Sequence, residues 1–206
     1  MNRLLHWMAF AAVALTGMGQ AHAGTAFTLT SPTSFSNGSW SFGEIFTVGA
    51  QNISVTALGA FDAGGDGFVS TGGIPVGIFR ESDGALLVST NVTSGDSLSA
   101  FYRYASISPL TLLSGISYRV VAVSESDLYN VDLGFTVDPA ITRSGYGYCF
   151  TTTLTKCDFN TGNERVWMAN FQFDNGGGSQ VPEPFSLVLS GAGLVALAIV
   201  RKRRAA

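Results

Sequence analysis

The chain has 206 residues, a formal net charge of −3, 46% hydrophobic residues and only 12% charged residues. So few charges argue against a coiled coil or a charged disordered tail, and the high apolar content argues against an intrinsically disordered chain. The charge balance, with no basic excess, indicates that nucleic acid is not a partner. A chain of this length is expected to form one domain, with or without appended segments.

The first 23 residues have the three-part pattern of a secretory signal peptide. Arg3 lies in a short n-region, an apolar stretch covers residues 4–15, and Ala21-His22-Ala23 forms an A-x-A cleavage site. Cleavage after Ala23 would make Gly24 the mature N-terminus. A buried or membrane-spanning helix is the alternative, but the apolar stretch is short and is followed by glycines. We therefore expect the domain that follows to lie outside the cytoplasm, where disulfides persist.

Three segments follow one another at the C-terminus. The motif Val181-Pro182-Glu183-Pro184 precedes an uncharged run over residues 185–200, and the basic cluster Arg201-Lys202-Arg203-Arg204 comes next. A helix of sixteen residues is about 24 Å long, which is short against a hydrocarbon core of about 30 Å. Because arginine side chains can extend to the interface, the run still predicts a single transmembrane helix. The basic tail, residues 201–206, is expected to stay in the cytoplasm.

In this order and position the three segments resemble the PEP-CTERM sorting signal of Gram-negative bacteria, over about 26 of the 206 residues. The resemblance implies that exosortase, a membrane enzyme, recognises residues 181–184 and processes the chain there. It also implies transient insertion in the inner membrane and a final location at the cell surface or in the extracellular matrix. Members of the family are associated with exopolysaccharide and biofilm. The alternative is a simple membrane anchor that is never cut.

Residues 24–174 are predicted to form an all-β domain, and a Gly-rich linker over residues 175–180 joins it to the sorting signal, residues 181–206. Thirteen acidic and six basic residues give the stretch from 24 to 180 a net charge of −7. Short apolar or alternating runs recur at about ten-residue spacing, and no segment shows a 3.6-residue apolar stripe. This pattern predicts a β-sandwich of jelly-roll type. The runs cover residues 40–48, 53–61, 74–79, 85–92, 101–107, 118–124 and 166–173, and Asp83-Gly84 is the predicted turn of a hairpin.

The body also resembles, more loosely, a domain common in exported bacterial proteins. The resemblance implies a β fold and brings no known activity with it. The residues that carry it are 46–48 and 55–59, the Gly/Asp loop after them, and then 76–79, 86–87, 101–104, 108–112 and 169–173.

The chemistry of the mature chain is limited by what its sequence omits. Both histidines, His6 and His22, lie in the signal peptide, which excludes Ser-His-Asp and Cys-His catalysis and histidine-ligated metals. A kinase or Schiff-base enzyme is disfavoured, because the body has one lysine, Lys156, and no phosphate-binding loop. A glycosidase-like carboxylate pair is the one route left open, and no pair stands out by its spacing. We therefore predict a protein that is not an enzyme and needs no cofactor.

Two local features invite a structural or metal-binding interpretation. In an oxidising compartment Cys149 and Cys157 predict a disulfide across a hairpin or loop, and no histidine or cationic cluster is at hand to make either thiol reactive. The loop from Asp62 to Gly67 is the best metal candidate, because two carboxylates, Asp62 and Asp66, could contact one Ca²⁺. The alternative is a glycine-rich turn whose aspartates cap backbone amides.

Aromatic residues near polar groups suggest a ligand of another class. The stretches 101–104 and Tyr146-Gly147-Tyr148 could stack on sugars, although alternation along a strand would place half of such residues in the core. The sequence as a whole predicts an exported structural or adhesive protein with extracellular polysaccharide as a candidate partner. Two alternatives remain, namely an uncut membrane-anchored carbohydrate-binding module and a polysaccharide-active enzyme.

Overall fold

The computed structural model describes residues 23–131, 134–158 and 166–175. Residues 1–22 of the predicted signal peptide and the whole sorting signal, residues 181–206, lie outside the described residues. Within the described ranges, no helix has the length and apolar character that a membrane crossing requires.

These ranges form the strands β1 (Ala23–Thr25), β2 (Phe27–Leu29), β3 (Ser34–Phe35), β4 (Trp40–Val48), β5 (Ile53–Phe61), β6 (Ile74–Arg80), β7 (Leu86–Val92), β8 (Ser97–Ser99), β9 (Tyr102–Leu112), β10 (Ser117–Val123), β11 (Tyr129–Asn130), β12 (Phe135–Val137), β13 (Ile141–Phe150) and β14 (Ala169–Asn175).

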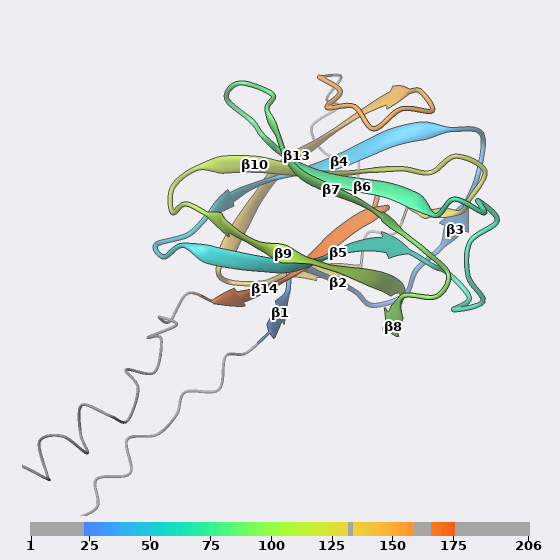
Figure 1. The fold of residues 1–206 in the computed structure, drawn as a ribbon, viewed down its shortest axis with the longest axis horizontal. Coiled ribbons are helices and arrows are strands. Elements are labelled where there is room, and N and C mark those ends of the chain that lie inside the picture. The colour runs from blue at the N-terminus through green and yellow to red at the C-terminus, as the bar shows by residue number, and fades with distance from the viewer. Residues whose placement is uncertain (1–22, 132–133, 159–165, 176–206) are drawn as a thin grey trace, which may run out of the picture.

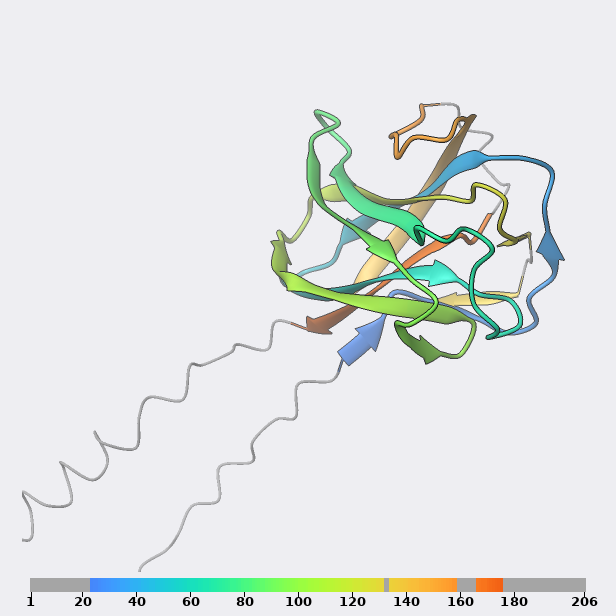
Figure 2. The same cartoon turned by 45° about the vertical axis from the view of Figure 1, so that its right-hand side comes forward.

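Two five-stranded antiparallel sheets pack face to face (Figures 1 and 2). Sheet I has the order β1-β14-β5-β9-β8, and sheet II has the order β13-β4-β10-β6-β7. The short pairs β11-β3 and β12-β2 form two further two-stranded sheets. The predicted all-β sandwich is therefore confirmed.

Aromatic side chains from both sheets fill the space between them. The ring of Phe46 on β4 lies 4.9 Å from that of Phe171 on β14, measured between ring centroids, and both residues are fully buried. Strand β4 turns Phe42, Phe46 and Val48 toward this core, as its two-residue side-chain period requires. Full burial of one such side chain contributes about 1.5–3 kcal/mol. This interior holds the sandwich together.

The seven predicted strands all appear in the structure. The runs 40–48 and 53–61 coincide with β4 and β5, and the predicted hairpin turn joins β6 to β7. At that turn Gly84 has a φ of +70°, a conformation that glycine adopts without strain. Strand β14 extends through Asn175, which pairs with Ile53 and was expected to open the linker.

The strand pairing defines two opposite ends of the sandwich. At the end that we call the terminal end, Ala23 pairs with Asp174, so the first and last described strands lie side by side (Figure 1). At the opposite end, which we call the distal end, the start of β4 meets the end of β13 through the pair Trp40 and Phe150. The distal end carries the candidate site.

Candidate functional site

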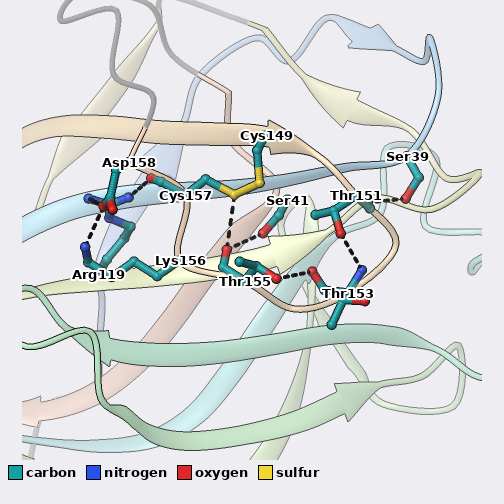
Figure 3. Close-up of a disulfide and its surroundings, with 10 residues drawn as sticks. All are labelled: Ser39, Ser41, Arg119, Cys149, Thr151, Thr153, Thr155, Lys156, Cys157 and Asp158. Atoms are coloured by element: carbon teal, nitrogen blue, oxygen red, sulfur yellow. Dashed lines mark hydrogen bonds and ion pairs between the residues drawn. A yellow bond between two sulfur atoms is a disulfide. The ribbon is translucent and has the colours of Figure 1, made fainter.

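A disulfide closes a loop on the outer face of sheet II. It joins Cys149, near the end of β13, to Cys157, with a Cα–Cα distance of 5.6 Å (Figure 3). The predicted pairing is present in the structure, and we call residues 150–158 the disulfide loop. Its chain lies across β4 and β10 rather than projecting into solvent, as the contacts of Arg119 and Ser41 show.

A row of glycines makes room for this loop. In sheet II, Gly147 on β13 pairs with Gly43 on β4. Gly43 pairs in turn with Val121 on β10, which pairs with Gly77 on β6. A Cβ on Gly43 would lie 2.8 Å from Cδ of Arg119, and one on Gly77 would lie 3.0 Å from Cδ2 of Leu154. A Cβ on Gly147 would overlap the carbonyl oxygen of Cys157. The glycines thus form a trough in which the loop lies.

Charged side chains anchor the C-terminal half of the loop. The buried guanidinium of Arg119 donates to the Cys157 carbonyl, beside which it lies in Figure 3, and from Nε at 3.0 Å to Glu81. Lys156 Nζ lies 2.7 Å from Oδ1 of Asp158 and 3.6 Å from Oε1 of Glu81. The hydrogen bond from Lys156, followed by its positive charge, lowers the pKa of Asp158. The carboxylates of Glu81 and Asp158 therefore form ion pairs with Arg119 and Lys156.

Hydrogen bonds from two serines at the start of β4 and just before it also hold the loop in place. Ser39 Oγ donates to the carbonyl of Thr151 at 2.8 Å, and the Thr151 amide donates to the Ser39 carbonyl at 3.2 Å. Ser41 Oγ donates to the Thr155 carbonyl at 2.7 Å. These bonds and the disulfide fix the position of the residues that follow Cys149, as Figure 3 shows.

Three aromatic residues gather where the disulfide loop begins, and we call them the aromatic cluster: Trp40, Tyr148 and Phe150. The ring centroid of Trp40 lies 5.1 Å from that of Phe150 and 5.8 Å from that of Tyr148. Trp40 Nε1 donates to Oδ1 of Asn37 at 2.7 Å, which orients the indole. Phe150 is 71% exposed, unusually high for a phenylalanine inside an aromatic group.

A hollow adjoins the aromatic cluster, and we call it the distal hollow. Its volume is about 540 Å³, within the range of small-molecule sites. A Cβ on Gly38 would lie 3.0 Å from the ring of Phe150, so the hollow and the ring are neighbours. Three segments supply its walls, namely the chain before β4, the turn after β10 and the start of the disulfide loop. The lining residues are Ser36, Gly38, Ser39, Glu125, Ser126 and Thr152.

The predicted Ca²⁺ residues have other partners in the structure. One carboxylate, that of Asp62, is buried and accepts hydrogen bonds from the amides of Gly65 and Gly67 at 3.0 and 3.1 Å. Arg103 Nε donates to it at 2.6 Å. Asp66 is exposed. These contacts are those of the capped glycine-rich turn, and in the described ranges no three acidic, cysteine or histidine side chains gather as a metal would require.

The aromatic stretches of the sequence divide between core and surface. Tyr102, Tyr104 and Tyr146 are buried, whereas Tyr148 is partly exposed and belongs to the aromatic cluster. Burial raises the pKa of Tyr102 and of Tyr104 well above 10. The sugar-stacking hypothesis therefore retains Phe101 and Tyr148, the two partly exposed aromatic residues of these stretches.

Sequence reasoning missed Trp40, Phe150 and Glu125. The exposure of Phe150 has no signal in the sequence, because an aromatic residue next to a cysteine is as typical of a core. Glu125 joins the hollow through a backbone φ of +48°, which is rare for a residue with a Cβ.

We compared the chain with family models and with curated proteins, and neither comparison found a match.

Proposed function

We propose that the protein is an exported structural or adhesive protein of the cell surface or extracellular matrix, without catalytic activity. In this proposal a signal peptide and the PEP-CTERM signal deliver a sandwich of jelly-roll type, and exosortase releases it from the inner membrane near residues 181–184. Its partner outside the cell is extracellular polysaccharide.

One observation carries the proposal, namely the separation of the two ends. Asn175, after which the chain continues toward the predicted sorting signal, is at the terminal end beside Ile53. The aromatic cluster is at the distal end, and the ten residues of β13 between the ends span about 30 Å. A protein attached through its C-terminal segment would therefore present its exposed aromatic residues away from the point of attachment, as adhesion requires.

The disulfide supports an extracytoplasmic location. A bond between Cys149 and Cys157 persists in oxidising compartments and is rare in the cytosol. The chain forms it on the outer face of a sheet, where it fixes a surface loop. Such a bond suits a protein that works outside the reducing cytoplasm.

For the enzyme alternative we consider the pair Glu81 and Asp158, which line an open hollow of about 500 Å³ together with Asp83. A glycosidase needs one carboxyl group with a raised pKa as its general acid. Lys156 instead lowers the pKa of Asp158, and both acids are ion-paired. The pair therefore favours loop anchoring over proton donation.

Cell fractionation with intact-mass measurement tests the proposal. We expect a mature form that begins at Gly24, lacks residues 185–206 and accumulates at the surface or in the medium. A matched variant with Pro182→Ala and Pro184→Ala is expected to stay in the membrane fraction uncut. A wild-type mature protein that retains residues 185–206 would refute exosortase processing and support the anchored alternative.

A further inference from the structure

We propose that the distal hollow and the ring of Phe150 together bind an uncharged sugar residue of a polysaccharide chain. The inference rests on the proposed function, since it names the ligand class of the protein proposed to act at the surface. It goes further by assigning the contact to particular residues at the distal end.

The apolar part of the site is a ring that is open on one side. Phe150 contacts Trp40 edge to face, with an interplanar angle of 81°, and still leaves 71% of its surface exposed. Trp40 and Tyr148 are partly buried against the core, so the exposed apolar surface of the aromatic cluster is mainly the ring of Phe150. A pyranose ring has a face of C–H groups that can pack on such a ring, while its hydroxyls point outward around the rim.

The polar part of the site matches those outward hydroxyls. Ser36, Ser39, Ser126 and Thr152 line the distal hollow. A hydroxyl can both donate and accept a hydrogen bond, and that of Ser39, which already donates to the Thr151 carbonyl, can accept one. The carboxylate of Glu125 can accept from sugar hydroxyls, and hydrogen bonds to an ionised acceptor are stronger than those between neutral groups. The hydrogen-bonding groups of the distal hollow therefore lie beside the ring of Phe150, which is adjacent to Gly38 of the lining.

The backbone of the site is held in place before a ligand arrives. Glu125 has a φ of +48°, a strained conformation of the kind that gathers at binding sites. The turn that carries it is tied to the neighbouring wall, because the Ser124 amide donates to the Trp40 carbonyl at 2.9 Å. The start of the disulfide loop, which forms the third wall, is held to the chain before β4 by the hydrogen bonds between Thr151 and Ser39. Such preorganisation reduces the entropy lost on binding.

The charge of the site selects among polysaccharides. Glu125 is the one charged residue that lines the distal hollow as the structure describes it. The body around it carries a net charge of −7. Uronate-containing or sulfated chains would be repelled, so that an uncharged chain is the ligand class that fits.

Affinity electrophoresis of the full chain, purified in mild detergent, tests this site. The gels contain galactomannan or hydroxyethyl cellulose as neutral probes, or polygalacturonate as the anionic probe. We expect a neutral probe to retard the wild-type chain and polygalacturonate to have no such effect. Phe150→Ala and Glu125→Gln should each weaken the retardation about 3- to 10-fold, as expected for one stacking or hydrogen-bonding contact.

The matched control is Leu113→Ala, which removes a side chain that is 54% exposed at the terminal end and should leave the retardation unchanged. Equal thermal midpoints of all variants would show that each is folded. Passage of the wild type through both neutral gels without retardation would overturn the proposal, as would full retardation of both site variants or stronger retardation by polygalacturonate. If the protein is exported and processed but is not retarded by a neutral polysaccharide, the binding site alone is refuted. If it is retarded but is never exported, the proposed function alone is refuted.

Discussion

At the scale of single residues, the hydroxyl of Tyr102 has an unusual environment. It lies in the core, and none of the described residues offers it a hydrogen-bond partner. Burial raises the pKa of Tyr102 well above 10.0, and the nearby acidic groups of Tyr104, once it ionises, and Glu44 add to the effect. The core therefore holds this phenol in its neutral form.

Replacing this residue by Tyr102→Phe should leave the free energy of unfolding at pH 7 unchanged or raise it by about 1 kcal/mol, because an unpaired buried hydroxyl is removed. The alkaline behaviour should change as well. Tyr102 has a raised pKa in the folded state, so its contribution is complete below pH 10 and is lost as the pH rises from there toward the folded value. Urea unfolding from pH 7 to 11 should show a steeper loss in the wild type than in the variant. Equal slopes would contradict this account.

At the scale of elements, the glycines of sheet II determine where the disulfide loop lies. Gly147→Ala would drive a methyl group into the Cys157 carbonyl and the Arg119 guanidinium. We expect the free energy of unfolding to fall by about 1–3 kcal/mol, the usual cost of overpacking.

The control for this variant is Gly72→Ala. A Cβ at that position meets nothing within 4 Å, and the unfolded chain becomes stiffer, so that stability should hold or rise slightly. Urea unfolding of both variants measures the difference. Equal stabilities would show that the loop does not lie tightly in the trough.

The same glycines explain which parts of the fold the sequence could predict. Strands such as β4 and β5 alternate apolar and polar residues, so a local pattern identifies them. Strand β13 was not predicted, because Gly145 and Gly147 interrupt its alternation. Gly147 serves a neighbour in space, namely the loop that packs on it. The alternation of residues within one strand cannot show that a distant segment needs this space.

The candidate site was predictable only in part for a related reason. The disulfide follows from two nearby cysteines in one chain segment. The distal hollow joins Ser36, Glu125 and Thr152, which lie in three separate segments. Their meeting depends on the pairing of β4 with both β10 and β13. No spacing in the sequence encodes such a group.

At the scale of the whole molecule, the N-terminal strands are tied into the core by Phe27. Its ring lies 5.2 Å from that of Trp167 and 6.2 Å from that of Phe171, measured between centroids. Phe27→Ala should therefore lower the free energy of unfolding by about 3–5 kcal/mol.

Phe35→Ala is the control, because this side chain is 47% exposed in another short N-terminal strand. Its loss should cost about 1 kcal/mol or less. Thermal or urea unfolding of the two variants compares them. Similar losses would mean that the N-terminal strands contribute little to the core.

The pairing of Ala23 with Asp174 has a consequence for the order in which the molecule can form. In sheet I, strand β14 lies between β1 and β5. Strand β1 therefore cannot pair until β14, the last strand in the chain, is present. In sheet II, β4 likewise pairs with β10 and β13, which both come much later in the chain. A ribosome or translocation channel that releases the chain from its N-terminus therefore delivers a domain that stays open until nearly all of it has emerged. Contacts between such distant segments slow folding, and the apolar strands need protection for as long as the sandwich is unfinished.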